Sequence, residues 1–137
     1  MYDKVIATVV GLVLTVTLMG QDSVREFREK ATKAAEAWLT LVDDAKYGES
    51  CESSTTLVKK AVSKEEWIQS IESARQMFGN VIRRTIKSRQ YTTTLPGAPD
   101  GDYVIIQYET VFEKKQSAVE TVTPMLDSDG QWRVSGY

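Results

Sequence analysis

The sequence predicts an α+β fold in which helices come first and a meander of antiparallel strands follows. Between Tyr91 and Tyr137, runs rich in Val, Ile, Thr and Tyr alternate with two turn-forming segments, residues 95–101 and 127–130. Pro and Gly supply the backbone angles that turns require, and β-branched and aromatic residues favour strands. Upstream, two helix-start motifs precede apolar residues at helical spacing. Helices followed by a meander indicate the α+β class.

The N-terminal segment carries the best indication of location. Lys4 is followed by an uncharged run, residues 5–19, which is slightly short for a membrane span and slightly long for a signal-peptide core. Leu18 departs from the small-residue cleavage pattern before Gly20, and Asp3 weakens a positive start. We expect residues 1–20 to form a hydrophobic helix that is a retained membrane anchor, with a cleaved signal segment as the alternative. Residues 21–137 are expected to form a single α+β domain.

The first amphipathic helix is predicted to begin at the capping box of residues 23–26, Ser-Val-Arg-Glu, and to run to about Asp43. Small Ala residues beside an aromatic favour a helix that lies on its own sheet over one that docks a partner helix. The apolar stripe consists of Val24, Phe27, Ala31, Ala34, Ala35, Trp38 and Val42.

A second amphipathic helix is predicted from the capping box of residues 63–66 to a stop at Gly79 and Asn80. Between the two helices, residues 43–56 turn polar and predict loops around a short, irregular helical piece. Trp38, Trp67 and Trp132 each fall on the apolar face of a different element. The apolar face of the second helix consists of Trp67, Ile68, Ile71, Ala74 and Phe78.

Four strands are predicted, and they cover residues 81–95, 103–112, 118–125 and 131–136. In the first, Ile82 and Ile86 share one face. Arg83, Lys87 and Arg89 are expected to share the other. That basic face could contact lipid head groups or an acidic partner, although a solvated face is the more common use of such residues.

Composition excludes several classes of function. Seventeen basic and nineteen acidic residues give a net charge of -2, which argues against a nucleic-acid partner because phosphate binding relies on clustered Lys and Arg. The chain has no histidine, so His-dependent catalysis and His metal ligation are excluded. The single cysteine, Cys51, permits no intrachain disulfide and is expected to be an inert buried thiol.

Several segments together carry a family resemblance, namely residues 35–39, 91–104, 108–112, 118–122 and 129–137. They resemble the bacterial family known as domain of unknown function 4019. The resemblance implies an exported cystatin-like or nuclear-transport-factor-like fold, with the domain on the periplasmic side of the inner membrane or free in the periplasm. It supplies no activity and no catalytic residues. Cys51 is a departure, since similar sequences carry a bulky aromatic there.

An isomerase-like enzyme would need only a carboxylate base and a hydroxyl donor. Asp43 or Asp44 could be the base, and Tyr91, Tyr103 or Tyr108 the donor. Helix ends and strand packing use the same residues for ordinary structural purposes. Glu120 also has such a structural role available. We therefore expect no catalytic, cofactor-binding or metal-binding residues.

The expected function is that of a non-enzymatic accessory or interaction subunit, with membrane lipid contacting residues 1–20, a protein partner in a membrane assembly, and no nucleic acid. The alternative is a small-molecule-binding or isomerase-like domain with a pocket between the first helix and the sheet.

Overall fold

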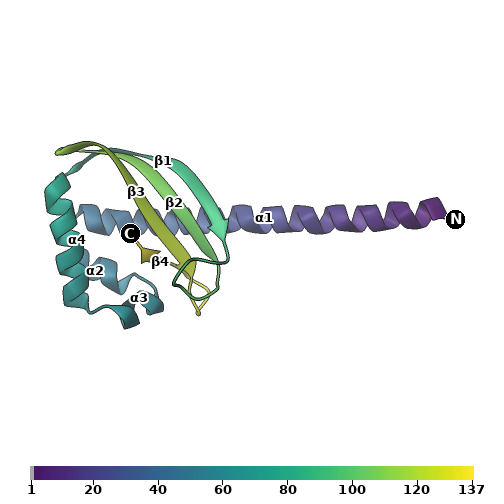
Figure 1. Ribbon diagram of the computed structural model, residues 1–137, viewed down its shortest axis with the longest axis horizontal. Coiled ribbons are helices and arrows are strands. Elements are labelled where there is room, and N and C mark those ends of the chain that lie inside the picture. The colour runs from purple at the N-terminus through teal and green to yellow at the C-terminus, as the bar shows by residue number, and fades with distance from the viewer. Residues whose placement is uncertain (1) are drawn as a thin grey trace.

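The computed structural model describes the backbone of residues 2–137 and the side chains of residues 20–137. In this part of the chain four helices precede four strands, as the α+β prediction requires (Figure 1). The helices are α1 (Tyr2–Asp43), α2 (Tyr47–Glu52), α3 (Thr56–Ala61) and α4 (Lys64–Phe78). The strands are β1 (Val81–Thr92), β2 (Tyr103–Phe112), β3 (Lys115–Leu126) and β4 (Trp132–Gly136).

The strands form one antiparallel sheet in the order β1-β2-β3-β4, so the predicted meander is confirmed. The sheet is curved, and the C-terminal half of α1 lies against one of its faces, contacting all four strands (Figure 1). We call this the inner face and the opposite one the outer face. The short helices α2 and α3 and the longer α4 gather at the end of the domain where α1 terminates.

Helix α1 is continuous from Tyr2 to Asp43, so the prediction that a helix begins at Ser23 is wrong. A capping box caps a helix only where the chain before it leaves the helical conformation, and residues 2–22 contain no proline to force that exit. The predicted end at Asp43 is confirmed. There Ala45 takes a positive φ of 60°, and the N–H of Lys46 donates to the carbonyl of Leu41 at 2.8 Å, which closes the last turn.

The predicted membrane anchor, residues 1–20, falls almost entirely outside the residues whose side chains the structure describes. Within the residues whose side chains the structure describes, 20–137, no helix is both long enough and apolar enough to cross a membrane. In Figure 1 the N-terminal half of α1 projects beyond the sheet as a single rod. The domain therefore sits at one end of a long helix.

Helix α4 has the ends that its sequence predicts. The Ser63 hydroxyl accepts a hydrogen bond from the N–H of Glu66 at 3.2 Å, which satisfies a free donor of the first turn. Gly79 follows the helix with a φ of 75°, a conformation that side chains other than glycine rarely adopt. In place of the single predicted helical piece between the main helices, the structure has two, α2 and α3, and Cys51 is buried in α2 as expected.

The hydrophobic core lies between α1 and the inner face of the sheet. The stripe of α1 packs on the chain's own sheet, as predicted, and Trp67 and Trp132 are partly buried against the same cluster. Phe27 extends this contact toward the N-terminus, with its ring 5.4 Å from that of Trp132. The core cluster consists of Ala31, Ala35, Trp38, Leu39, Val42, Ile71, Val104, Ile106, Tyr108, Val122 and Val134.

Strand β1 differs from its prediction in two respects. It ends at Thr92, not residue 95, because the next residues form a loop in which the N–H of Gly101 donates to the carbonyl of Thr93 at 3.1 Å. A bulge between Ile86 and Ser88 also shifts the alternation of side chains, so the prediction that Arg89 shares a face with Arg83 and Lys87 is wrong.

Beyond the bulge Arg89 turns to the inner face and donates to the Thr32 hydroxyl of α1 at 3.3 Å. The apolar residues of β1 are also less buried than their alternation suggests. Ile82 is 66% exposed and Ile86 44% exposed, since β1 lies at the edge of the sheet.

Candidate functional site

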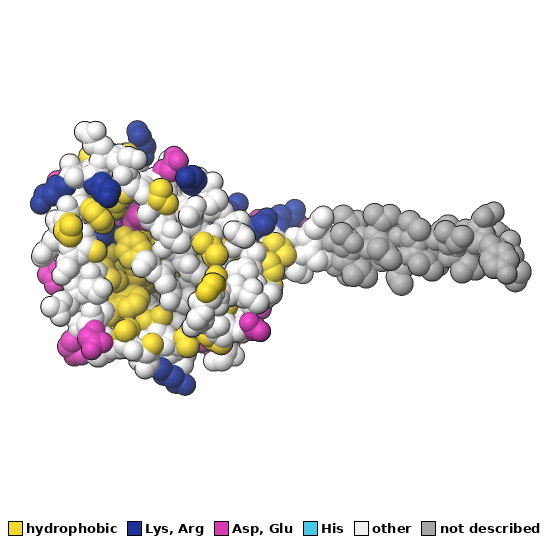
Figure 2. All heavy atoms as spheres, viewed as in Figure 1, with side chains coloured by type: hydrophobic (Ala, Val, Ile, Leu, Met, Phe, Trp, Pro, Cys, Tyr) yellow, Lys and Arg dark blue, Asp and Glu magenta, His cyan; other side chains and the backbone are white. Residues whose placement is uncertain are grey.

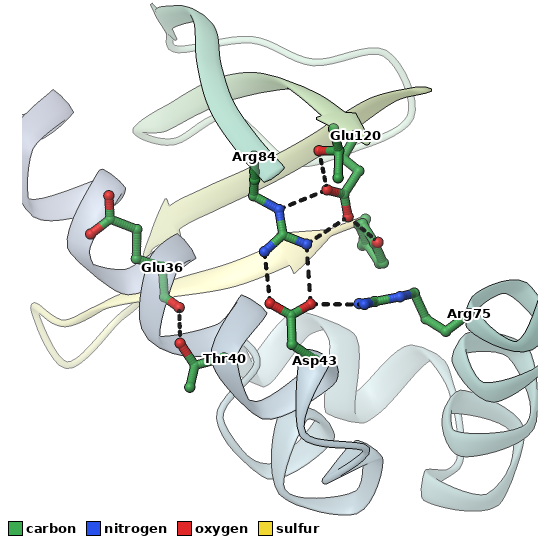
Figure 3. Close-up of polar contacts among 8 residues, drawn as sticks. Glu36, Thr40, Asp43, Arg75, Arg84 and Glu120 are labelled. Carbon is green, nitrogen blue, oxygen red and sulfur yellow. Dashed lines mark hydrogen bonds and ion pairs between the residues drawn. The ribbon is translucent and has the colours of Figure 1, made fainter. Parts of the chain in front are cut away.

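Four charged side chains meet where the end of α1, α4 and the inner face of the sheet come together, and we call Asp43, Arg75, Arg84 and Glu120 the charged cluster (Figure 3). Arg84 is its centre. Its Nη1 and Nη2 atoms donate to Asp43 Oδ2 and Oδ1 at 2.8 and 3.1 Å, and its Nε and Nη2 atoms donate to Glu120 Oε1 and Oε2 at 2.7 and 3.2 Å. One guanidinium therefore holds two carboxylates, each through two hydrogen bonds, the geometry that suits arginine best.

Local structure explains how these residues meet. Asp43 is the last residue of α1, one position after the buried Val42. Arg84 takes an inner-face position in β1, and Glu120 does so in β3. Thr110 of β2 lies opposite Arg84 and donates its hydroxyl to Glu120 Oε1 at 2.5 Å, and the Tyr137 hydroxyl donates to Glu120 Oε2. The cluster thus joins the helix to strands from both halves of the sheet.

Arg75 enters the cluster from α4. Its Nη2 donates to Asp43 Oδ1 at 2.8 Å, and its guanidinium lies 5.3 Å from the centre of the Phe112 ring. The side chain is 6% exposed, and its Nε and Nη1 atoms have no hydrogen-bond partner among the described residues. The ring face supplies a favourable cation–π contact in their place. Two cations and two carboxylates leave the cluster electrically balanced.

The pKa values of the two carboxyl groups reflect this pairing. Burial by itself would raise the pKa of Asp43, but hydrogen bonds and charge from Arg84 and Arg75 outweigh it and hold the pKa below its usual value. The same balance lowers the pKa of Glu120, where Arg84, Thr110 and Tyr137 oppose the effect of burial. Both groups are therefore ionised carboxylates with little tendency to accept a proton, which makes them weak general bases.

A hollow of about 370 Å³ lies beside the cluster on the inner face. Tyr108 borders it; the residue is buried, and its hydroxyl has no hydrogen-bond partner in the described part of the chain. Burial first, and then the negative charge of Glu36, raise the pKa of Tyr108 to about 12. The hydroxyl is therefore a neutral donor at physiological pH. The residues that line this inner hollow are Glu36, Leu39, Thr40, Arg84, Ile86 and Tyr108.

The structure separates most of the residues that the sequence offered as an acid–base pair. Asp43 lies in the charged cluster, whereas Asp44 is exposed beside it. Tyr91 donates to Asp102 at 2.5 Å and Tyr103 to the carbonyl of Pro99 at 2.7 Å, both near the loop that joins β1 to β2. Of the three candidate donors, Tyr108 alone borders the inner hollow.

Sequence reasoning missed Arg75 and Arg84 as members of a site. A signal was present in each case. Arg84 lies between Ile82 and Ile86, on the face that strand alternation assigns to apolar residues. Arg75 lies four residues after Ile71, on the apolar face of α4. A cation at an apolar position of a helix or strand predicts a buried ion pair, because an unpaired buried charge is too costly.

In the described part of the chain, no group of three or more Cys, Asp or Glu residues is arranged to hold a metal ion. The site therefore offers paired charges, one free buried hydroxyl and a small hollow.

Comparison with known proteins gives one family. No curated protein matches the chain. Among solved structures, a Campylobacter jejuni protein proposed to be an NTF2-like transpeptidase is 17% identical, with a TM-score of 0.45 over 75% of this chain and 94% of that one. The family described as protein of unknown function DUF4019 matches residues 34–137, which include all four strands and the whole charged cluster. The chain therefore belongs to the DUF4019 family.

Proposed function

We propose that this chain is a non-enzymatic accessory subunit, membrane-anchored or periplasmic, that presents its α+β domain to a protein partner at the end of a long helix. The observation that carries the proposal is the close packing of α1 on the inner face along most of their contact, with the inner hollow open beside it. Ala31, Ala35 and Leu39 pack there against Val104 and Ile106 with no residual exposure above 2%. A domain whose interior is occupied by its own side chains acts through its surface.

The charged cluster supports the same conclusion. Asp43 and Glu120 each have an arginine partner, and the pKa of each is lowered, so neither is set up to take a proton from a substrate. Hydrogen-bonded charge pairs of this kind, which range from the buried Glu120 to the partly exposed Asp43, fix the relative positions of the elements that carry them. In this reading the cluster locks α1 and α4 to the sheet and does no chemistry.

The surface supports an interaction role. On the face shown in Figure 2, hydrophobic side chains gather in a band across the domain, near the place where Figure 1 shows the C-terminus. Tyr137 is 42% exposed, and Val58, Val62 and Trp67 line a shallow apolar hollow between α3 and α4. Exposed apolar surface of this kind is typical of contact sites between proteins.

The anchor is part of the proposal and rests on sequence. Residues 5–19 carry no charge, and α1 runs without a break from that segment into the domain. A cystatin-like or nuclear-transport-factor-like, cone-shaped fold is likewise proposed, and it is supported by the long helix that crosses a curved antiparallel sheet (Figure 1).

The test is co-purification. The full chain is extracted from bacterial membranes in mild detergent, and the proteins that accompany it are identified by mass spectrometry. We expect a membrane protein to accompany the full chain, and a chain that lacks residues 1–20 to be lost from the membrane fraction. The intact mass of the native protein tests the anchor. A mass that corresponds to a chain starting near Gln21 would mean that the N-terminal segment is cleaved and that the protein is periplasmic.

A second candidate function, small-molecule binding or isomerase-like chemistry, is favoured by one specific observation. The unpartnered hydroxyl of Tyr108 and the carboxylate of Glu36 both belong to the inner hollow, and a hydroxyl donor with a carboxylate is the pair such chemistry needs. Tyr108→Phe and Glu36→Gln separate the two functions. Variants that keep the co-purifying partner but lose the cellular phenotype would establish a ligand site and overturn the accessory role.

A further inference from the structure

The chain covers one edge of its sheet and leaves the other open. At the β4 edge, Ser54 forms a bridge with Val134, and the N–H of Thr55 donates to the Val134 carbonyl at 2.9 Å. At the opposite edge β1 pairs with β2, and no other strand of the described chain pairs with it. Backbone N–H and C=O groups along the edge of β1 are therefore available to another strand, with irregularities of register between Val81 and Arg83 and between Ile86 and Ser88.

The charge of the open edge is of one sign. Strand β1 carries Arg83, Arg84, Lys87 and Arg89 and no acidic residue, although the whole chain has a net charge of -2. Arg84 is neutralised by the charged cluster, and Arg89 is engaged with Thr32. Arg83 and Lys87 form no ion pair with any described residue. Among the described residues, positive charge is thus unpaired at Arg83 and Lys87 on the outer face, and also at Arg89 on the inner face, where the hydrogen bond to Thr32 leaves the charge in place.

A hollow flanks the same part of β1 on each face of the sheet. The outer hollow, about 400 Å³, extends from β1 across β2 to β3; Arg83, Thr85 and Lys87 border it on the β1 side, and Glu109 is the single acidic residue of its lining. The inner hollow, about 370 Å³, is bordered by Arg84 and Ile86 and is walled by Leu39 of α1. Successive side chains of a strand point to opposite faces, so a strand added beside residues 83–87 would place alternate side chains in the two hollows.

These features select the occupant. A second copy of the chain would set one cationic β1 against another, and like charges on paired strands are destabilising. An acidic side chain suits the outer hollow, where two cations outnumber Glu109. An uncharged side chain suits the inner hollow, where the half-exposed Ile86 provides an apolar contact and Glu36 disfavours a second carboxylate.

We propose that the open edge of β1 binds an extended segment of a partner protein as an added strand, and that this segment alternates acidic and uncharged residues. Backbone hydrogen bonds to β1 give the affinity, and the two hollows with Arg83 and Lys87 give the sequence preference. The inference rests on the proposed accessory function and names the surface and the chemistry of its partner.

The test uses the full chain in mild detergent and a defined probe, an end-capped peptide of about nine residues that alternates Glu and Val. We expect the peptide to bind, to slow amide hydrogen exchange in β1, and to bind more weakly as salt increases. A peptide with Lys in place of Glu should not bind. A peptide of the same composition, with Glu and Val in separate blocks, should bind much more weakly, because it cannot fill the two hollows alternately.

Paired variants locate the contact. Arg83→Gln with Lys87→Gln should weaken peptide binding about tenfold, the effect expected from losing two exposed ion pairs. Lys33→Gln with Lys60→Gln removes the same charge from exposed positions on α1 and α3 and should leave binding unchanged. Both variants keep the charged cluster intact, so a folding defect is not expected in either.

Three results would overturn the proposal. The first is equal binding of the alternating and block peptides, and the second is amide exchange in β1 that the peptide does not change. The third is protection of the β1 amides that increases with protein concentration in the absence of peptide. The last would assign the edge to a second copy. Failure of the accessory role looks different, since peptide binding would persist while no partner co-purified. If a partner co-purified equally with the Arg83→Gln, Lys87→Gln variant, the accessory role would stand and the edge assignment would fail.

Discussion

Two parts of one interface hold α1 to the sheet, and they do so by different physical means. Along most of the contact, an apolar seam made of Ala31, Ala35, Trp38, Leu39 and Val42 packs against the inner face. At the C-terminal end of α1, the charged cluster holds the helix to the sheet through the ion pair between Asp43 and Arg84. The seam is stabilised by burial, which is non-directional and insensitive to pH. The cluster depends on directed hydrogen bonds between ions, so its contribution changes with protonation and with the loss of any one member.

The seam should show the largest effect of a single substitution. Trp38 is 2% exposed, its ring lies 5.0 Å from that of Tyr137, and its Nε1 donates to the Ser50 carbonyl at 3.0 Å. Trp38→Ala should lower the free energy of unfolding by about 3 to 5 kcal/mol, the usual cost of deleting a large buried aromatic. The urea midpoint measures this. A midpoint that hardly moved would mean that Trp38 is not part of the core in solution.

The cluster should give a smaller, still substantial effect. Arg84→Met leaves Asp43 and Glu120 close together without their shared cation, and we expect a loss of about 2 to 3 kcal/mol. Arg83→Met is the matched control on the outer face of the same strand, where no ion pair is broken within the described residues. Equal urea midpoints for the two variants would show that the cluster contributes nothing to stability.

Acid should act on the cluster and spare the seam. The folded-state pKa values of Asp43 and Glu120 lie below their ordinary values of 3.8 and 4.5, so their contribution is complete above those values and is lost as pH falls through the lowered ones. Melting temperature should therefore fall more steeply below about pH 4.5 for the native chain than for Asp43→Asn with Glu120→Gln. The Trp38→Ala variant should keep the native pH dependence.

The smallest effect is expected one residue beyond the cluster. Asp44 is exposed, whereas Asp43 is paired with two arginines. Asp44→Asn should change the free energy of unfolding by less than about 0.5 kcal/mol. A larger change in the urea midpoint would mean that Asp44 also takes part in the cluster, and that the two adjacent carboxylates do not differ in their contribution to stability as expected.

The periodicity of apolar residues predicted the seam and the sheet, because the spacing of these residues along the chain indicates which face of a helix or strand is buried. Helical spacing identified Trp38 and Ala35, and the turn residues around Pro96 and Gly130 separated the strands in the right order. A capping motif misled the prediction at Ser23, since the motif fits a helix start and is also tolerated inside a helix.

The charged cluster was not predictable in the same way. Asp43 and Arg84 lie 41 residues apart and come together through the packing of α1 on the sheet, which no local pattern encodes. The bulge after Ile86 likewise depends on the pairing of β1 with β2, and it reverses the face on which Arg89 lies.

Ser50 has a consequence for how the domain comes apart. Its carbonyl accepts the indole N–H of Trp38 from α1, and its hydroxyl accepts the indole N–H of Trp67 from α4 at 3.0 Å. Helix α2, which contains Ser50, has only six residues and is too short to persist alone. Fraying of α2 would break the hydrogen bonds to both indoles. Separation of α1 or α4 from α2 would break one of them. We therefore expect α2 to open together with the parts of α1 and α4 that carry Trp38 and Trp67, and its amide protons to exchange through that shared opening.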